Sequence, residues 1–467
     1  MKTLPYTICV RSDAHSSEVQ EVRCRRILRA LPRRRETFEA LWRDREVILK
    51  VFGHPWKARL HGRRESRGFQ RLAQLGLAAP AVLCYGRTED GRWAVVTEKV
   101  KDAASLLELL VAQGGPERPT SLLRLASGEL ARLHDCGVIQ RDFHPGNFLI
   151  KGQRLIVLDP GQIRFLSRPV GRAASIGQLA CLARFLAPDD RPEALDVLCT
   201  TYAKARQWQW GKADQSRFRR SFKRERRREI RWTGKRPLYK GRSNVRIKTR
   251  DGLAVAGKIL SESGEFADLA ASIEGRMNAG DVLRRDASRC VARFDWAGHE
   301  IVATRFDEVG LLSTLGAIFR GSCARRRWVA ARRLLLLRIP VAMPLGLIEK
   351  RRGPFRRCSY LLMRSVHGQP LGDWLCDESV STTSKHRLVR QIFAVFERLA
   401  GHDITWGRLE TKDIVVTDGG PVFTGFRGVV IHISPLQCRR RYRRETARFT
   451  HALETLGLDS EILAAAD

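Results

Sequence analysis

The amino-acid sequence predicts an α+β fold made of two successive domains. Three observations support this prediction. In the first half, strand patterns come before helix patterns; a strongly basic run separates the two halves; and the second half weakly repeats the first. With 467 residues, 43% of them hydrophobic, the chain is long enough to build two cores. We place the first domain at residues 1–235 and the second at residues 236–467.

Strand patterns dominate the first hundred residues. Short β-branched and apolar stretches predict strands at 22–28, 37–42, 46–52, 82–85 and 92–100. A helix is expected at 61–76, where Phe69, Leu72 and Leu75 recur on one face. Helices are then expected at 105–112 and 119–135, followed by short strands at 147–151 and 155–158 and by mostly helical chain to about residue 230. This order predicts a small β-rich lobe followed by a helical lobe.

The second half of the chain weakly repeats the first, at a constant offset over its later part and with a small gap upstream of it. Residues 132–159 and 398–425 align without a gap, and WAVVTEKV (93–100) faces SYLLMRSV (359–366). The alignment is held by apolar positions rather than by identities, which indicates a shared structure more than a shared activity. We therefore expect a tandem duplication.

The charge of the chain indicates anionic partners. It carries 85 Lys and Arg against 50 Asp and Glu, a formal net charge of +35. Nucleic acid, phosphorylated glycolipid and an anionic membrane surface all attract such a chain, although no nucleic-acid-binding motif is present. The run from Arg217 to Arg236 interleaves basic residues with Phe218, Phe222 and Trp232, and a second basic cluster spans 439–444. Both predict peripheral contact with an anionic membrane; the alternative is that both are solvated helix faces.

The cysteines and the apolar stretches bear on location. The eleven cysteines include no C-x-x-C pair, so neither a clustered metal site nor a secreted disulfide scaffold is expected. The first residues lack the apolar run of a signal peptide. The most apolar later stretch, 334–348, is interrupted by Arg338, Pro340 and Pro344 and is too short to cross a membrane. We expect a cytoplasmic protein with at most peripheral contact at the inner face of the cytoplasmic membrane.

Five residues of the first half occur in the order that phosphoryl transfer from ATP requires. Lys50 lies in an expected strand and can reach the nucleotide phosphates, and Glu65 in the following helix can hold it by an ion pair. Asp142, in QRDFHPGN, can orient the acceptor hydroxyl as catalytic base. Asn147, at the end of the same QRDFHPGN segment, and Asp159, in LIVLDPG, can ligate Mg²⁺. Each residue alone is weak evidence, but the ordered set predicts a kinase-like site that uses ATP and Mg²⁺.

The pattern also departs from that of protein kinases. We count Glu98, at the end of an expected strand, among the nucleotide-binding residues. No Gly-rich loop is present; the first turn contains Arg33 to Arg35, which could cover the phosphates or could simply be solvated. Gln140 stands where many kinases have His, and Pro160 replaces the Phe of D-F-G. We interpret His144 as a residue that structures the loop.

These motifs resemble those of the lipopolysaccharide kinase family, which includes the Kdo and heptose kinases. The resemblance is carried by LHDCGVIQRDFHPGNFLI with LIVLDPGQIRF, and more weakly by the second half. It implies two tandem bilobal protein-kinase-like domains and an ATP- and Mg²⁺-dependent transferase of lipopolysaccharide biosynthesis. The implied acceptor is a sugar hydroxyl, of Kdo or heptose, on an anionic lipid-linked core. A UbiB-type kinase is a weaker match because the K-x-G-Q segment is missing.

The second half lacks the catalytic groups at the aligned positions. Thr304 stands for Lys50, Arg327 for Glu65, Arg408 for Asp142, Asp413 for Asn147 and Gly425 for Asp159. This predicts a pseudokinase, in which Asp413 could still bind a metal weakly and Arg305 is a poor substitute for the lysine. The alternatives for the whole chain are a UbiB-type or protein Ser/Thr kinase and a non-catalytic basic scaffold.

Overall fold

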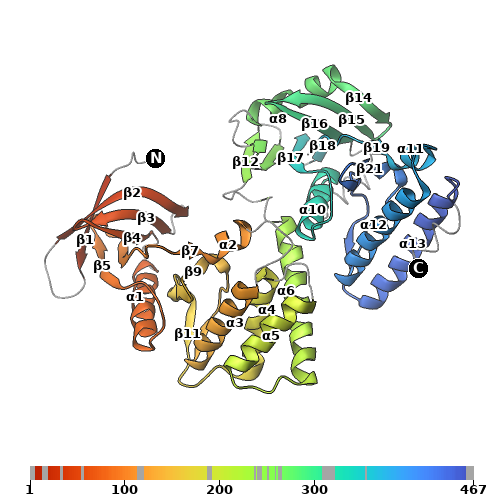
Figure 1. Ribbon diagram of the computed structural model, residues 1–467. Helices are drawn as coiled ribbons and strands as arrows, with labels where there is room; N and C mark the ends of the chain where they lie inside the picture. The colour runs from red at the N-terminus through yellow and green to blue at the C-terminus, as the bar shows by residue number, and fades with distance from the viewer. Residues whose placement is uncertain are drawn as a thin grey trace. The chain divides into compact units, whose positions relative to one another are not determined.

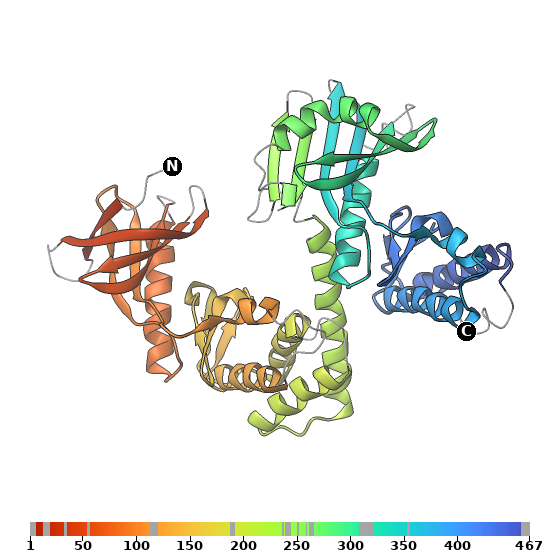
Figure 2. The same ribbon diagram turned by 45° about the horizontal axis from the view of Figure 1, so that its top comes forward.

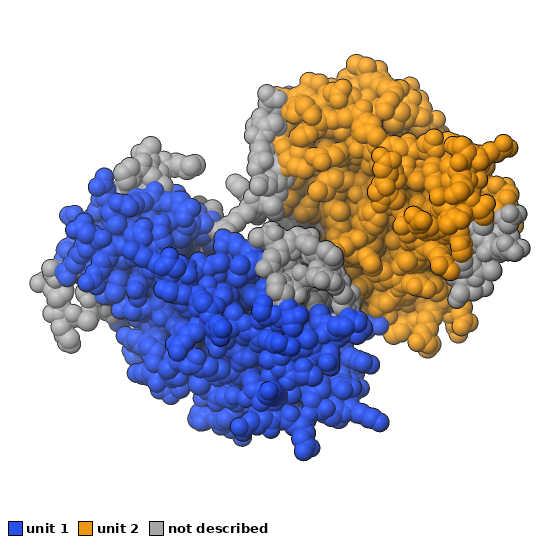
Figure 3. Space-filling view, viewed as in Figure 1, with its two compact units in different colours: residues 1–225 blue, residues 226–467 orange. Residues whose placement is uncertain are grey.

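The structure is a computed structural model with mixed helices and strands (Figures 1 and 2). It describes residues 6–12, 19–31, 35–53, 57–112, 120–186, 192–235, 238, 244–249, 252–257, 259–260, 266–307, 321–352 and 355–458. The chain forms two compact units, Met1–Glu225 (unit 1) and Arg226–Asp467 (unit 2), coloured separately in Figure 3. This division falls inside helix α6 (Lys212–Lys235), whereas we predicted a boundary at the end of that helix. Phe218 and Phe222 of α6 belong to a core of unit 1, and Ile230 belongs to a core of unit 2.

Unit 1 begins with a closed barrel of six strands in the order β1-β2-β3-β4-β6-β5. The strands are β1 (Tyr6–Ser12), β2 (Val19–Leu31), β3 (Arg35–Trp42), β4 (Arg45–Phe52), β5 (Val82–Thr88) and β6 (Trp93–Glu98). Alternate apolar residues of these strands fill the barrel, because successive side chains of a strand point to opposite faces. We did not predict β1, which closes the barrel by pairing with both β2 and β5. Helix α1 (Ala58–Gln74) follows β4.

The rest of unit 1 consists of helices and short hairpins. The elements are β7 (Ala104–Ser105), α2 (Leu106–Ala112), α3 (Thr120–Asp135), β8 (Val138–Gln140), β9 (Phe148–Lys151), β10 (Arg154–Val157), β11 (Ile163–Phe165), α4 (Arg172–Leu186), α5 (Pro192–Ala205) and α6. Helix α3 buries Leu123, Ala126 and Leu130 at helical spacing, so one face of the helix enters the core. The small sheets β10-β9-β7 and β11-β8 hold the segment with the predicted catalytic residues.

Unit 2 begins with an open sheet of seven strands in the order β12-β13-β17-β18-β16-β15-β14. The strands are β12 (Asn244–Thr249), β13 (Gly252–Gly257), β14 (Asp281–Asp286), β15 (Arg289–Trp296), β16 (His299–Asp307), β17 (Pro344–Arg352) and β18 (Phe355–Arg364). Helix α8 (Phe266–Ala279) packs with Ala254 and Leu362, whereas α10 (Cys323–Leu336) packs with Val255 and Leu361. Because neighbouring strand residues alternate between faces, the two helices cover opposite faces of the sheet.

The remainder of unit 2 follows the element order of unit 1. The elements are β19 (Gln369–Pro370), α11 (Leu371–Cys376), α12 (Thr382–Gly401), β20 (Ile404–Thr405), β21 (Ile414–Thr417), β22 (Gly420–Phe423), β23 (Val430–Ile431) and α13 (Pro435–Glu454). Hairpin β21–β22 has the register of hairpin β9–β10: Ile414 pairs with Phe423 as Phe148 pairs with Val157. These four residues occupy equivalent positions in the alignment of residues 132–159 with 398–425.

Helix α6 contains the first basic run and corrects part of our membrane prediction. We expected Phe218, Phe222 and Trp232 to seat at a membrane surface. Phe218 and Phe222 are 3% and 6% exposed and stack with ring centroids 5.9 Å apart, so the expectation is wrong for these two residues. They are apolar residues one helical turn apart, and the core of unit 1 buries them. Trp232 remains 59% exposed. Among the described residues, no helix is long and apolar enough to cross a membrane.

Candidate active site

Lys50 and Glu65 meet between the barrel and α1. Lys50 lies in β4, and its neighbours Leu49 and Val51 point into the barrel core, so the lysine side chain points outward. Its ammonium forms a close ion pair with the carboxylate of Glu65, a buried residue of α1. Lys50 Nζ also donates to the carbonyl oxygen of Leu158 at 2.9 Å, which ties β4 to the residue just before Asp159. Burial raises the pKa of Glu65, the nearby charge of Lys50 opposes this, and the charge of Asp159 adds to it.

Asp159 follows β10 and lies close to this pair. A Cβ atom on Gly68 of α1 would lie 2.7 Å from the Cβ of Pro160, so only glycine permits the helix to approach this closely. The carboxylate of Asp159 lies 3.6 Å from the Arg35 guanidinium (Oδ2 to Nη1). Arg35 is the described end of the basic turn that could cover the phosphates or be solvated; Arg33 and Arg34 lie outside the described residues.

Asp142 and Asn147 occupy one turn between β8 and β9. Asn147 donates from Nδ2 to the backbone oxygen of Asp142 at 3.0 Å, which leaves its amide oxygen available to a cation. His144 accepts the Gly146 N–H at 3.0 Å and begins the 3₁₀ turn, consistent with a residue that structures the loop. The side chain of Asp142 is exposed, as a group that meets an acceptor must be.

Gln140 helps to fix the position of the two aspartates. It is buried, and its amide donates to the backbone oxygen of Asp159 at 3.2 Å. Its own backbone oxygen accepts from Gln178 of α4. The structure thus brings three of the predicted site residues together: Lys50 pairs with Glu65, and the charge of Asp159 acts on Glu65. Gln140, which was not among the predicted site residues, ties Asp159 to the strand that leads to Asp142.

Glu98 is placed differently from the other predicted residues. It is exposed at the end of β6, and its backbone N–H donates to the Ala81 oxygen at 2.9 Å. Within the described part of the chain, no interaction joins its side chain to the four residues above. Any contact with nucleotide would have to come from this strand end rather than from the cluster around Lys50.

Sequence reasoning missed a basic pocket of unit 1 beside the predicted site. The pocket has a volume of about 750 Å³ and is bordered by Asp159's neighbours Pro160 and Gly161. Its arginines are Arg63, Arg64, Arg67, Arg71, Arg141 and Arg164, and its described lining contains no acidic residue. Four of them share α1 at three- and four-residue spacings, which place side chains on one helix face. That spacing, visible in RRESRGFQR, was the available signal.

The oxygen donors of unit 1 suit a magnesium–nucleotide complex. Mg²⁺ is usually held by one or two protein oxygens together with phosphates and water. The Asp159 carboxylate and the Asn147 amide oxygen provide such a pair. Lys50 donates to the oxygen of Leu158, the residue before Asp159, and is therefore near enough to meet phosphate oxygens. No cluster of three or more His, Cys, Asp or Glu able to hold a metal by itself occurs among the residues that the structure describes.

Unit 2 places different groups at the aligned positions. Lys50 pairs across the sheet with Val95, and Thr304 pairs with Leu361, the residue aligned with Val95. Thr304 therefore takes the place of the lysine. Arg305, which we considered as a substitute, instead forms an ion pair with Asp307 at 2.9 Å.

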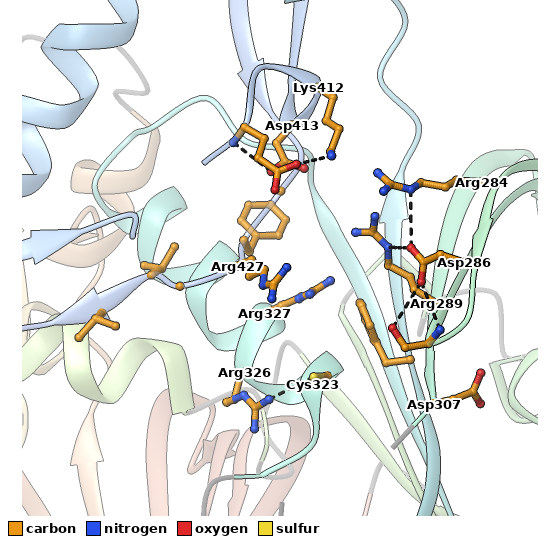
Figure 4. Close-up of a pocket in the computed structure, with 18 residues that line it drawn as sticks. Arg284, Asp286, Arg289, Asp307, Cys323, Arg326, Arg327, Lys412, Asp413 and Arg427 are labelled. Atoms are coloured by element: carbon orange, nitrogen blue, oxygen red, sulfur yellow. Dashed lines mark hydrogen bonds and ion pairs between the residues drawn. The ribbon is translucent and has the colours of Figure 1, made fainter. Parts of the chain in front are cut away.

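In unit 2, the space beside Gly425, the residue aligned with Asp159, is filled by a side chain of the same unit. A Cβ atom built on Gly425 would lie 2.2 Å from Cγ of Asp413, so the Asp413 side chain takes the space that a side chain at 425 would need. Figure 4 shows Asp413 above Arg327 and Arg427 in the pocket where these residues meet. Burial raises the pKa of the Asp413 carboxyl.

The sequence of unit 1 matches a known kinase family. Residues 12–189 match the sequence model of the lipopolysaccharide kinase (Kdo/WaaP) family. This segment is therefore similar to the kinases of that family. It contains all five residues of the predicted catalytic set, and the resemblance inferred from the motifs is confirmed for this part of the chain.

The curated relatives that match part of the chain are protein kinases. The serine/threonine-protein kinase PknL of Mycobacterium bovis is 31% identical over 157 residues, which cover 31% of this chain and 37% of the relative. PknL of Mycobacterium tuberculosis is 29% identical over 153 residues, with the same coverage. The chain thus spans little more than a third of the length of these relatives.

Two solved structures illustrate the structural comparison. Vaccinia related kinase 3 has a TM-score of 0.31 and 12% identity, covering 48% of this chain and 85% of its own. The PknI kinase domain of Mycobacterium tuberculosis has a TM-score of 0.29 and 18% identity, covering 43% of this chain and 95% of its own. Scores this low define no closer relationship.

Proposed function

We propose that unit 1 is an ATP- and Mg²⁺-dependent kinase that phosphorylates a sugar hydroxyl of an anionic, lipid-linked acceptor of the lipopolysaccharide-core type. The observation that carries the proposal is the cluster of Lys50, Glu65 and Asp159 inside the segment that matches the lipopolysaccharide kinase family. The relatives named above are protein kinases, so the nature of the acceptor rests on the family match and on the charge of the site.

Each residue has a defined part in this proposal. Lys50 binds the nucleotide phosphates and is held by Glu65, while Asp159 and the amide oxygen of Asn147 hold the metal. When bound, Mg²⁺ neutralises charge on the phosphates. Asp142, exposed at the start of its turn, orients the acceptor hydroxyl and accepts its proton. Arg35 lies close enough to Asp159 to add a positive charge where protein kinases use a Gly-rich loop.

The arginine pocket of unit 1 supports an anionic acceptor. It is lined by Arg141, the neighbour of Asp142, and by Pro160 and Gly161, the neighbours of Asp159, so it adjoins the proposed site of transfer. Guanidinium groups bind carboxylate and phosphate oxygens in pairs. An acceptor sugar that carries such groups would find six arginines and no competing carboxylate in the described lining.

Transfer assays test the proposal. The full chain should move the γ-phosphate of ATP to purified lipopolysaccharide core and leave protein substrates unmodified. Arg64→Gln with Arg67→Gln should raise KM for the acceptor at least tenfold and leave KM for ATP unchanged. Arg124→Gln, an exposed position on α3 outside the pocket, is the matched control. Phosphorylation of protein but not of glycolipid would favour the protein-kinase alternative instead.

We further propose that the chain is a tandem duplication whose second copy is a pseudokinase. The shared hairpin register and the equivalent strand positions of Lys50 and Thr304 support a common origin. The exchange of all five catalytic groups supports the loss of phosphotransfer in unit 2. The difference between the closed barrel of unit 1 and the open sheet of unit 2 shows how far the two copies would have diverged.

Peripheral membrane contact is proposed for α13 rather than for the aromatic residues of α6. Ile433 and Leu436, at the start of α13, are 80% and 69% exposed. The exposed arginines that follow them are Arg439, Arg440, Arg441, Arg443 and Arg444. Apolar residues beside basic ones suit an anionic bilayer surface, where each basic residue contributes about 1 kcal/mol.

A further inference from the structure

The pocket of unit 2 has lost the groups of a kinase site and gained arginines. It has a volume of about 570 Å³ and lies between the β14–β16 strands, the start of α10 and the segments around Asp413 and Gly425 (Figure 4). Its cations are Arg284, Arg289, Arg326, Arg327, Arg427 and Lys412. This set comes from four separate parts of the sequence, so the fold rather than a local run assembles it.

The acidic residues of the pocket leave Arg326, Arg327 and Arg427 without an ion pair among the described residues. Arg326 donates to the Gly321 oxygen, and the charge of Asp413 acts on Arg327 from nearby without forming an ion pair. Glu410 pairs with Lys412, and Asp307 pairs with Arg305, which lies outside the described lining. Asp286 lies between two cations, 3.5 Å from Arg289 and 3.7 Å from Arg284. Both distances are longer than an ideal charge-assisted hydrogen bond, so these arginines retain donors for a ligand.

Arg327 is the central unpaired cation. Its guanidinium lies 4.1 Å from the ring centroid of Phe306, and within the described residues it forms no ion pair. Burial lowers the pKa of Arg327 to about 10, so it remains charged at neutral pH. Arg427 lies beside it in Figure 4 and also has no carboxylate partner in the described part of the chain. Two unpaired guanidinium groups side by side repel each other, and a bound anion would remove that repulsion.

An apolar slot continues from this basic pocket. It has a volume of about 460 Å³ and shares Arg289, Arg327 and Asp413 with the basic pocket. Its apolar lining includes Val291, Val302, Ala342, Leu361, Met363 and Val415, and its rim also carries Arg293 and Arg364. Ligand pockets commonly measure 300–1,000 Å³ and combine apolar walls with a few charged groups. The slot suits a planar group, and the arginines suit phosphates attached to it.

We propose that unit 2 binds a nucleoside di- or triphosphate without a metal ion, with its base in the apolar slot and its phosphates against Arg289, Arg327 and Arg427. The guanidinium groups neutralise the phosphates directly. The position aligned with Asp159 is Gly425, and Asp413 fills the adjacent space, so the metal-binding arrangement proposed for unit 1 is not repeated. The inference does not depend on catalysis by unit 1.

Calorimetry on the full chain with ATP tests this proposal. The chain carries Asp159→Ala, which removes the metal-binding carboxylate proposed for unit 1, and the buffer contains excess EDTA. We expect saturable binding of ATP, no tightening when Mg²⁺ replaces EDTA, and much weaker binding of adenosine. Arg427→Gln, an exposed position, should weaken binding about tenfold, and Arg327→Gln should weaken it at least as much. Arg390→Gln, exposed on α12 and outside both pockets, is the matched control and should change nothing.

Three results would overturn the proposal. The first is no binding of ATP in EDTA, and the second is binding that ignores both Arg427→Gln and Arg327→Gln. The third is equal affinity for pyrophosphate, glucose 1-phosphate and ATP, which would mean that the pocket reads phosphate alone. Circular dichroism of each variant checks that it folds. If Arg327→Gln does not fold, binding by the Arg427→Gln variant alone decides whether the proposal stands. Mg²⁺-dependent binding by the parent chain reports on unit 1 separately, so failure of one proposal is distinguishable from failure of the other.

Discussion

The segments 142–159 of unit 1 and 408–425 of unit 2 have the same backbone plan and different chemistry. Each contains a 3₁₀ turn followed by a hairpin with the same register. Apolar residues such as Phe148 and Ile414 are buried in both. The residues at the positions that would meet ATP, metal or acceptor change in chemical type, whereas the buried positions stay apolar. The comparison teaches that apolar positions maintain this part of the fold and that the catalytic groups can be exchanged without altering it.

A second contrast concerns what stabilises the cleft. In unit 1 a lysine and a glutamate neutralise each other between β4 and α1. In unit 2 the corresponding residues are Thr304 and Arg327, and the arginine packs on Phe306 rather than on a carboxylate. A buried ion pair positions its members precisely only when both are present, because the loss of one leaves an uncompensated charge. In unit 2 neither the lysine nor the glutamate is present, so no unpaired charge of that ion pair remains.

The largest expected effect comes from breaking the catalytic set of unit 1. Lys50→Met and Asp159→Ala should each abolish the Mg²⁺-dependent part of the stabilisation by ATP, which reports on unit 1 and for a ligand at a hundred times its Kd is about 2.7 kcal/mol. Asp142→Ala should leave that stabilisation intact and reduce transfer at least a thousandfold, because it removes the base and not the nucleotide site. Nucleotide-dependent thermal shift and a transfer assay measure the two effects.

The matched change in unit 2 is Arg408→Ala, at the position aligned with Asp142. It should alter neither nucleotide-dependent stability nor transfer. Wild-type thermal shifts in both Lys50→Met and Asp159→Ala would show that the site has been assigned to the wrong residues.

A smaller effect is expected from restoring a side chain at position 425. Gly425→Ala should destabilise unit 2 by about 1–3 kcal/mol, because its Cβ would collide with Asp413. In an Asp413→Ala background the same change should cost little, so the two substitutions should be strongly non-additive. Hydrogen exchange of the β21–β22 hairpin during mild urea denaturation measures the destabilisation in the single and in the double variant. A neutral Gly425→Ala on its own would contradict the packing described for this position.

The response to acid should also differ between the units. His134 of α3 is fully buried between Tyr202 and Gln178, and burial lowers its pKa to about 4 from 6.5. Between pH 6.5 and 4 the histidine binds a proton in the unfolded chain but not in the folded chain, so the free energy of unfolding falls as pH falls. From pH 7 to pH 5 this amounts to about 2 kcal/mol. Ala400 stands at the aligned position of unit 2, so this histidine is absent there, although burial also lowers the pKa of His432 in unit 2.

Unit 2 instead has Glu445, whose pKa burial raises to about 6. An acid with a raised pKa adds stability below about pH 4.5 that is lost as pH rises through 6, the opposite direction. Amide exchange of α3 and α12 at pH 7 and pH 5, corrected for intrinsic rates, separates the units. His134→Gln should remove most of the pH dependence of α3; an unchanged dependence would assign it to other groups.

The smallest expected effect concerns membrane contact. Ile433→Ser with Leu436→Ser should reduce recovery of the chain with vesicles of anionic lipid by a few-fold at low salt. Trp232→Ser on α6 is the comparison variant: it tests membrane contact by α6, whereas the double substitution tests contact by α13. High salt should release the wild type, because screening weakens electrostatic attachment. Equal recovery with neutral and anionic vesicles, or none with either, would argue against the proposed surface.

Local patterns in the sequence identified most elements of unit 1 to within a few residues. The strands at 37–42 and 46–52 and the helix at 119–135 agree with β3, β4 and α3, because each carries its own apolar periodicity. The strand β1 was missed, since this short segment becomes a strand through pairing with β2 and β5, which lie apart in the sequence. Phe218 and Phe222 were misplaced for a related reason: helical spacing shows that they share a face but not whether protein or lipid covers it.

The sequence alone determined the order and spacing of the predicted catalytic residues and the resemblance of residues 12–189 to the lipopolysaccharide kinase family. It also determined which of these residues unit 2 lacks. Only the tertiary structure decided that Lys50 meets Glu65, that Asp413 fills the space beside Gly425, and that arginines from distant segments converge on one pocket in each unit. The physical reason is that a motif constrains neighbours along the chain, whereas charge repulsion, ion pairing and steric exclusion act between side chains that folding brings together.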